Sequence, residues 1–172
     1  MRTKETEVLE SNVASGLIDR RPGDLKPWPG NPRIHNDKQL AKLKTSIQKF
    51  GFTAPVLVDE AGVILSGHGR VQAAKALELP TIPTRVIAGL SQAQKRAYVI
   101  ADNKLAELAA WDDTLLKDEL ELLIAESFDI ETTGFSTAEI DILFDGAEER
   151  SGSDPDDLRP DDIRGRGRFT GG

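Results

Sequence analysis

The sequence predicts an α+β fold for residues 17–110 and a short C-terminal helical extension after them. Three observations lead to this fold class. Apolar residues recur at helical spacing in several segments, short runs rich in Val and Ile stand between them, and Gly and Pro separate the two kinds of segment. With 38% hydrophobic residues among 172, the chain can bury one modest core.

The first elements are a short strand and a proline-rich loop. Leu17 and Ile18 begin the strand, and residues 20–32 hold four prolines and two glycines, which is typical of a loop. Trp28 lies inside this loop. We expect its ring to anchor the loop on the core, with stacking on a nucleic-acid base as the alternative.

Helical patterns recur along the rest of the chain. A helix is expected from Asp37 to Phe50, with Gly51 as its C-terminal cap. Another begins at Ser91 with a capping-box pattern and runs to about Leu108. Two more helices follow in the extension. Asp113 is expected to cap the first, and Ser136 with Glu139 forms a capping box that opens the second.

Three strands lie between these helices. Residues 55–59 form the first, Glu60-Ala61-Gly62 turns the chain, and residues 63–65 return as the second strand of a hairpin. Residues 82–87 form the third. Because Pro83 has no N–H to donate, we expect this strand near an edge of the sheet.

The segment Ser66-Gly67-His68-Gly69-Arg70 joins the hairpin to an Ala-rich helix that reaches about Glu78. A strand, a glycine turn and a helix together can hold a phosphate, because glycines let the backbone approach and N–H groups at the helix start face an anion. Arg70 could bind that phosphate. His68, expected to project from the turn, could bind it or move a proton. The alternative is a plain turn with a polar surface histidine.

Asp102 and Asn103 stand inside an otherwise apolar helical pattern. Both residue types are unfavourable in a helix interior, since their side chains compete for backbone hydrogen bonds. They indicate either a local kink or a use. Carboxylate and amide oxygens together with phosphate oxygens suit Mg²⁺, so these two residues are candidate metal ligands.

The charges divide the chain. Residues 19–110 hold fourteen Lys and Arg against eight Asp and Glu, a net charge of +6, whereas residues 111–162 hold three against eighteen, a net charge of −15. Solvated helix faces would explain both values. Alternatively, the basic front meets phosphates and the acidic rear meets a partner or masks the front.

Composition excludes several classes of function. Without cysteine there are no disulfides, thiolate metal sites or cysteine nucleophiles. No apolar run is long enough to span a membrane, and the N-terminus lacks the apolar core of a signal peptide, so a cytoplasmic protein without a membrane partner is expected. We expect residues 1–16 to be a flexible lead, residues 111–146 an acidic helical extension and residues 147–172 a disordered tail.

The ordered motifs resemble the N-terminal domain of the ParB/sulfiredoxin superfamily over residues 17–110. They are Asn31-Pro32-Arg33, Leu40-x-x-Leu43-x-x-Ser46-Ile47-x-x-x-Gly51, Pro55-Val56-x-Val58, Gly67-x-x-Arg70-x-x-Ala73, Ile82-Pro83 and Asp102-Asn103. The resemblance implies a small mixed sheet with packed helices that binds a nucleotide. ParB members of the superfamily bind and hydrolyse CTP with Mg²⁺. Other members bind ATP, phosphorylate small molecules or are described as nucleases.

The phosphate motif of that family is Gly-Glu-Arg-Arg, and residues 67–70 stand in its place. Arg70 keeps the last arginine, while His68 replaces the glutamate and Gly69 the first arginine. Because that carboxylate is missing, the resemblance implies nucleotide binding more than CTP hydrolysis. The sulfiredoxin motif contains a cysteine, which this chain lacks, so sulfinic-acid reduction is excluded.

The other motifs carry over in the same way. Asn31-Pro32-Arg33 matches the Gln-Pro-Arg box near the nucleotide, and Asp102-Asn103 matches a Glu-Asn pair beside metal and phosphate. These variants of the family motifs are most similar to ParB-like domains found ahead of phage and prophage DNA methylases. This chain would then correspond to the ParB-like front domain alone, without the methylase half. Residues 111–145 are expected to be too small and acidic to read DNA, so no ParB helix-turn-helix domain is expected.

We therefore expect a domain that binds a nucleoside triphosphate, CTP or ATP, with Mg²⁺ and acts in DNA metabolism. One alternative is a nuclease or small-molecule phosphotransferase with His68 or Asp102 as the acid or base. Another is a non-enzymatic module that binds DNA or a DNA methylase, and a homodimer is also considered. The candidate nucleotide-binding residues are Asn31, Pro32, Arg33, Ser66, Gly67, His68, Gly69 and Arg70, and the candidate metal ligands are Asp102 and Asn103.

Overall fold

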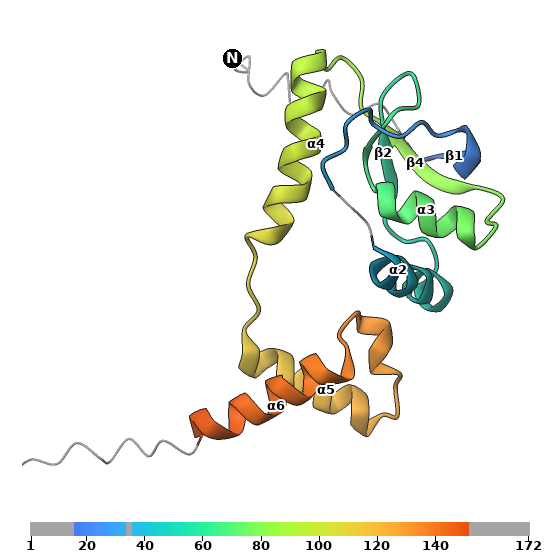
Figure 1. Cartoon of the computed structure of the whole chain (residues 1–172). Coiled ribbons are helices and arrows are strands. Elements are labelled where there is room, and N and C mark those ends of the chain that lie inside the picture. Colours follow the sequence, from blue (N-terminus) through green and yellow to red (C-terminus); the bar gives the residue numbers. More distant parts are fainter. Residues whose placement is uncertain (1–15, 34–35, 152–172) are drawn as a thin grey trace, which may run out of the picture.

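The computed structural model describes residues 16–33 and 36–151. It has the α+β fold expected, with a four-stranded mixed sheet in the order β1-β4-β2-β3 (Figure 1). Strand β4 pairs antiparallel with β1 and parallel with β2, and β2 and β3 form the predicted antiparallel hairpin. The strands are β1 (Ile18–Arg20), β2 (Val56–Val58), β3 (Ile64–Ser66) and β4 (Ile82–Val86).

Helices cover both faces of this sheet. The main ones are α2 (Asp37–Phe50), α3 (His68–Ala76) and α4 (Gln92–Glu107). Two residues of β3 show the division, because neighbouring side chains of a strand point to opposite faces. Ile64 belongs to a cluster with Val71 and Ala74 of α3, whereas Leu65 packs with Val99 of α4.

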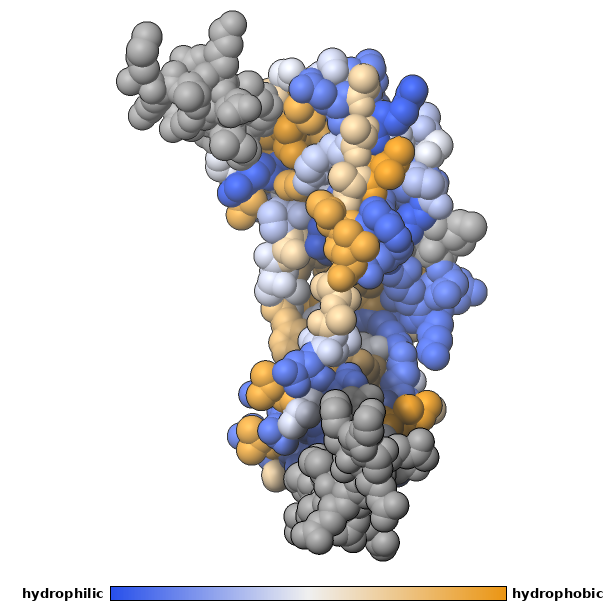
Figure 2. Space-filling view, turned by 90° about the vertical axis from the view of Figure 1, so that its left-hand side faces the viewer, coloured by the Kyte–Doolittle hydropathy of each residue, from blue (hydrophilic) through white to orange (hydrophobic). Residues whose placement is uncertain are grey.

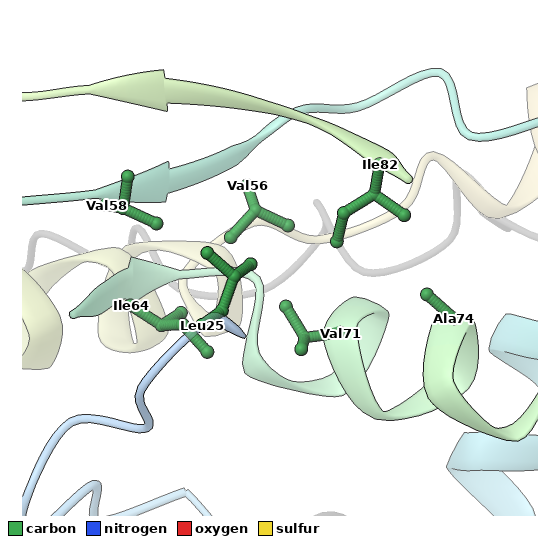
Figure 3. Close-up of a cluster of buried hydrophobic side chains, with 7 residues drawn as sticks. All are labelled: Leu25, Val56, Val58, Ile64, Val71, Ala74 and Ile82. Atoms are coloured by element: carbon green, nitrogen blue, oxygen red, sulfur yellow. The ribbon is translucent and has the colours of Figure 1, made fainter. Parts of the chain in front are cut away.

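Figure 3 shows the first of these clusters, in which branched side chains from three strands meet α3. Its members are all buried: Leu25, Val56, Val58, Ile64, Val71, Ala74 and Ile82. Burying a side chain of this size contributes about 1.5–3 kcal/mol relative to leaving it in water. The cluster therefore fixes α3, and with it the glycine turn at its start, against the sheet.

Several helix boundaries agree with the sequence. Helix α2 begins after Asn36, whose side chain accepts the N–H of Gln39, and it ends at Phe50 as expected. Helix α4 opens with the predicted capping box, in which Ser91 and Gln94 satisfy each other's backbone N–H groups.

Other boundaries differ. Helix α3 ends at Ala76, ahead of the expected Glu78, which has a positive φ of 54°. Asp112 rather than Asp113 caps the next helix, because its carboxylate accepts the N–H groups of Thr114 and Leu115. The last helix continues to Ser151, beyond the expected end at residue 146, since Ala, Glu and Arg favour helix there. The expectations for residues 1–15 and 152–172 lie outside the described residues.

The expectation that β4 lies near an edge is wrong. Strand β4 stands inside the sheet, between β1 and β2. Pro83 is tolerated there because the pairing with β2 begins one residue later, at Thr84, and only the three-residue β1 lies opposite it on the other side.

A buried lysine ties the hairpin to α4. The Nζ atom of Lys95 lies 2.9 Å from Asp59 Oδ2 and 3.1 Å from Glu60 Oε2, and the Lys95 and Asp59 side chains are only 9% and 5% exposed. Asp59 also accepts the N–H groups of Ala61 and Val63 at 2.9 Å through its other oxygen. We call this set of Lys95, Asp59 and Glu60 the Lys95 clamp.

The acidic extension forms a separate lobe below the sheet domain (Figure 1). It consists of α5 (Asp113–Ala125), the short 3-10 helix η2 (Ile130–Thr133) and α6 (Thr137–Ser151). Residues 109–112 connect it to α4. None of the helices in the described part of the chain is long and apolar enough to cross a membrane.

The lobe returns to contact α2. The ring of Phe128 stacks on Phe50 with centroids 6.4 Å apart, and the ammonium of Lys49 lies 4.6 Å from the Phe128 centroid. Lys42 donates to the carbonyl of Gly134 and lies 3.6 Å from a carboxylate oxygen of Glu139. Two lysines of the basic front are thus engaged by the acidic rear.

The surface seen from the side of α4 mixes hydrophobic and hydrophilic side chains (Figure 2). Ile100, Leu105 and Leu108 are among the exposed hydrophobic residues of α4 and its C-terminal end. Isolated exposed apolar residues are normal on protein surfaces, so they carry no functional assignment here.

Candidate functional site

A pocket of about 200 Å³ lies where the start of α3 meets α2, α4 and the loop before α2. It brings together many residues that the sequence singles out, although Arg33 and Asn103 stand 70 positions apart in the chain. The lining residues are Arg33, Gln39, Leu43, Ser66, Gly67, His68, Gly69, Arg70, Asp102, Asn103 and Ala106. The sheet and the core fix its floor, since Ser66 ends the buried strand β3.

Gly67 and Arg70 determine the shape of the turn. Gly67 precedes α3 with a positive φ of 94°, a conformation that favours glycine. A Cβ atom at this position would also lie 2.8 Å from Arg70 Nη2 and 3.1 Å from its Nε. Glycine therefore suits this position for two reasons: the backbone has a positive φ, and a Cβ atom would push the Arg70 guanidinium out of its place.

The guanidinium of Arg70 is held in place by one hydrogen bond, but not all of its donors have a partner. Its Nη2 atom donates to the carbonyl of Pro55 at 3.3 Å, while its Nε atom is buried and has no hydrogen-bond partner. Burial lowers the pKa of Arg70 below its usual value, and the charge of Asp102 acts in the opposite direction. A buried cationic donor without a partner is costly, and an anion in the pocket would relieve that cost.

His68 does not project from the turn as expected. It is the first residue of α3 and is 8% exposed. Its Nε2 atom accepts the backbone N–H of Trp28 at 3.2 Å, which requires a ring with no proton on that nitrogen. His68 therefore fastens the proline-rich loop to α3, and this buried arrangement suits it poorly for proton transfer to a ligand.

The Asn31-Pro32-Arg33 motif is only partly at the pocket. Arg33 lines it and donates to the carbonyl of Asn103 at 3.2 Å, with Glu107 3.5 Å away. Asn31 instead stabilises the loop, because its side chain accepts the N–H of Arg33 at 3.3 Å. Asn31 and Pro32 do not line the pocket, so of the three only Arg33 reaches it. Trp28 packs beside the buried cluster of Leu65, Ile87 and Val99, which confirms it as a loop anchor.

Asp102 and Asn103 do not break α4, which is continuous. Asn103 donates from Nδ2 to the carbonyl of Val99 at 2.7 Å, one turn earlier, and both residues face the pocket. The carboxylate of Asp102 adds to burial in raising the pKa of Tyr98. The side-chain oxygens of these two residues are of the type that Mg²⁺ accepts. Among the described residues no group of three His, Asp or Glu could hold a metal by itself.

Three lining residues are not among the candidate site residues that the sequence indicates. Gln39 and Leu43 lie one turn apart on α2, and Ala106 lies one turn beyond Asn103 on α4. Ala106 could have been found from the sequence, because it lies one helical turn beyond the candidate residue Asn103. Nothing local indicates that α2 faces the glycine turn, since that follows from its packing against α3.

Fold and site together define a small α+β domain with an arginine-lined pocket at the start of a helix. Residues 11–110 match the family of the ParB N-terminal domain, which is more than half of the chain. The chain therefore belongs to the family of ParB N-terminal domains.

Two known proteins are similar in sequence. One is the ParB-like nuclease domain-containing protein YnaK of Escherichia coli, 47% identical over 80 residues, which are 46% of this chain and 92% of that protein. The other is the uncharacterized protein ORF326b of Acidianus two-tailed virus, 42% identical over 45 residues, which are 26% of this chain and 14% of that protein.

The fold is shared with a solved structure of known identity. It is the C-terminally truncated chromosome-partitioning protein ParB from Caulobacter crescentus complexed with CTP-gamma-S, with a TM-score of 0.60 and 21% identity. The similarity covers 77% of this chain and 87% of that one. At this level of identity it supports the α+β assignment and the arrangement of the sheet and its helices.

The acidic lobe has a match of its own. Residues 114–164 match the family described as the ParB-methyltransferase HTH domain. The expectation that no helix-turn-helix domain follows is therefore wrong. The misleading observation was the charge. Residues 111–146 contain one lysine, Lys117, and eleven Asp and Glu residues, but the net charge of a segment says little about its fold.

Proposed function

We propose that this chain binds a nucleoside triphosphate, CTP or ATP, with its phosphates in the pocket at the start of α3. The observation that carries this proposal is Arg70, whose buried Nε donor lacks a partner at the N-terminal turn of a helix. Backbone N–H groups at that end of a helix and a guanidinium both favour an anion.

The size of the pocket supports phosphates rather than a whole nucleotide as its contents. Pockets for complete small ligands usually measure about 300–1,000 Å³, and this one measures about 200 Å³. The ribose and base would then extend beyond it. The Caulobacter relative in complex with CTP-gamma-S agrees with this choice of ligand class.

Mg²⁺ fits the other side of the same pocket. Asp102 supplies a carboxylate, and Asn103 keeps its side-chain oxygen while its Nδ2 donates to Val99. Mg²⁺ commonly takes one or two protein oxygens and completes its shell with phosphates and water. When bound, it would neutralise phosphate charge, and Asp102 would be the residue that orients it.

Binding is a better proposal than hydrolysis. His68 stands where the family pattern has a glutamate, and its ring is buried with Nε2 committed to the N–H of Trp28. Asp102 is then the remaining candidate for an acid or base at the pocket if the chain acts as a nuclease or phosphotransferase. Such turnover would be lost in Asp102→Asn but retained in His68→Asn.

Calorimetry with CTP, ATP and GTP in the presence of Mg²⁺ tests the proposal. We expect Arg70→Ala to weaken binding by about 1.5–3 kcal/mol, a rise in Kd of about 10- to 150-fold, because a charge-assisted hydrogen bond is lost. Arg85→Ala removes the same charge from an exposed position on β4 and should leave Kd unchanged. Absence of binding by the wild-type chain at millimolar nucleotide would refute the proposal.

A second candidate function is DNA binding in the service of a DNA methylase, favoured by the match of residues 114–164 to the ParB-methyltransferase HTH family. The basic front, rather than the acidic lobe, would meet the phosphates, because it carries the excess of Lys and Arg. Lys42 and Lys49 of α2 are engaged by the lobe in the free chain.

We expect this DNA binding to be weak, steeply dependent on salt and indifferent to nucleotide. The double substitution Phe128→Ala with Glu139→Gln should strengthen it and steepen the salt slope, since it removes the carboxylate beside Lys42 and the ring beside Lys49. Titration of a labelled duplex at several NaCl concentrations measures both quantities. An unchanged slope in the double variant would show that these lysines do not meet DNA.

A further inference from the structure

A groove of about 740 Å³ lies between α5 and α6, away from the glycine turn. Its apolar side includes Trp111 and Phe135, whose rings meet edge to face at 5.5 Å. Trp111 and Ile142 remain 69% and 72% exposed. The groove thus offers aromatic and aliphatic surface that no described segment covers fully.

The rim of this groove is acidic. Among its described lining residues are four carboxylates, from Asp113, Asp118, Glu121 and Glu139, and one cation, Lys117. Lys117 is already used, since its Nζ lies 3.7 Å from Glu121 and 5.4 Å from the centroid of Phe144. An occupant that matches this surface carries several cations and at least one aromatic or aliphatic side chain.

The chain itself contains such a segment. Residues 163–172 read Ile-Arg-Gly-Arg-Gly-Arg-Phe-Thr-Gly-Gly and have a net charge of +3. The stretch before it, residues 152–162, holds five Asp and one Arg, so the acidic lobe would repel it. Charge therefore selects the segment from Arg164 to Phe169, here called the arginine segment, over its neighbours.

We propose that the arginine segment docks into the groove between α5 and α6 of its own chain. Guanidinium groups bind carboxylates in a forked geometry and also stack on aromatic faces, and the groove offers both beside Trp111. Phe169 supplies the apolar side chain for the surface around Phe135 and Leu143. This docking does not depend on nucleotide binding at the pocket of the sheet domain.

The length of the chain permits the contact. Along α6, Glu139 and Ser151 are about 18 Å apart at 1.5 Å per residue. Residues 152–163 can span up to about 40 Å when extended. Tethering of this kind gives an effective concentration in the millimolar range, so an interaction that is weak between separate molecules would still be populated within one chain.

The two tryptophans give a direct readout in the full chain. In ¹H–¹⁵N spectra at low salt, replacing Arg164, Arg166 and Arg168 with Gln should move the indole N–H signal of Trp111 and leave that of Trp28 in place. Trp28 lies in the sheet domain beside Leu65 and serves as the internal reference. A control with the same change in charge, Arg2→Gln with Lys4→Gln and Arg159→Gln, should move neither signal.

A second set of variants identifies the groove as the receptor. In a chain with Asp118→Asn and Glu121→Gln, the three tail substitutions should no longer shift Trp111, whereas they still should in a chain with Glu119→Gln and Glu126→Gln. At about 0.5 M NaCl the shift should largely vanish, because screening weakens exposed ion pairs. A Trp111 signal that ignores the tail, or a shift that depends on protein concentration, would overturn docking within one chain.

Discussion

Replacing Lys95 with Met is expected to destabilise the fold by about 3–5 kcal/mol, the usual cost of leaving one partner of a buried ion pair alone. The side chain of Asp59 is 5% exposed and loses the ammonium 2.9 Å from its Oδ2 atom. Glu60 loses the same partner but is 48% exposed and can be hydrated. Urea denaturation at neutral pH measures the change in the free energy of unfolding.

The matched control removes both buried charges. In a chain with Lys95→Met and Asp59→Asn, the asparagine oxygen can still accept the N–H groups of Ala61 and Val63. We expect this double variant to recover most of the stability that Lys95→Met alone loses. If the two variants are equally unstable, packing of the lysine stem rather than the unpaired carboxylate carries the effect.

The Lys95 clamp also has a defined pH window. Burial would raise the pKa of Asp59, but hydrogen bonds from Lys95 and from Val63 lower it below 3.8, and hydrogen bonds from backbone N–H groups and Lys95 lower that of Glu60 to about 2. The hydrogen bond to Asp59 raises the pKa of Lys95 above 10.5, against the effect of burial. A carboxylate whose pKa is lowered by folding stabilises the fold at pH values above its unfolded pKa, and this contribution is lost as the pH falls through its folded pKa. A lysine whose pKa is raised by folding stabilises the fold at pH values below its unfolded pKa, and this contribution is lost as the pH rises through its folded pKa. The clamp should contribute fully between about pH 4.5 and 10.5.

The clamp shows where prediction from the sequence stops. Elements with a strong local pattern were predicted closely, such as α2 with its apolar spacing and α4 with its capping box. Lys95 and Asp59 are 36 positions apart, and nothing near either one indicates the other. Their pairing follows only when the hairpin and the start of α4 meet in the folded chain.

The pocket divides in the same way. The turn from Ser66 to Arg70 was predicted because glycine and arginine next to a strand carry a local meaning. The role of His68 was not, because α3 begins at His68 itself and the acceptor it offers is used by Trp28, 40 positions earlier. A side chain in the first turn of a helix can face the core or the solvent, and only the covering loop decides which.

Gly67→Ala should separate the strain of the turn from the function of Arg70. An alanine at φ +94° costs about 1–2 kcal/mol of stability. Its Cβ would also stand 2.8 Å from Arg70 Nη2 and displace the guanidinium from the pocket. We therefore expect a modest loss of stability together with a loss of nucleotide affinity as large as that of Arg70→Ala, about 10- to 150-fold.

Gly134→Ala is the matched control for this experiment. Gly134 has nearly the same φ, +95°, and a Cβ there would meet nothing within 4 Å. It should lose the same 1–2 kcal/mol or so of stability to backbone strain and keep its nucleotide affinity. In the double variant, Gly67→Ala should weaken binding no further once Arg70 is alanine, because both substitutions remove the same contact. Additive losses would mean that the backbone of the turn binds the phosphates independently of Arg70, and the helix start rather than the guanidinium would then be the main anion site.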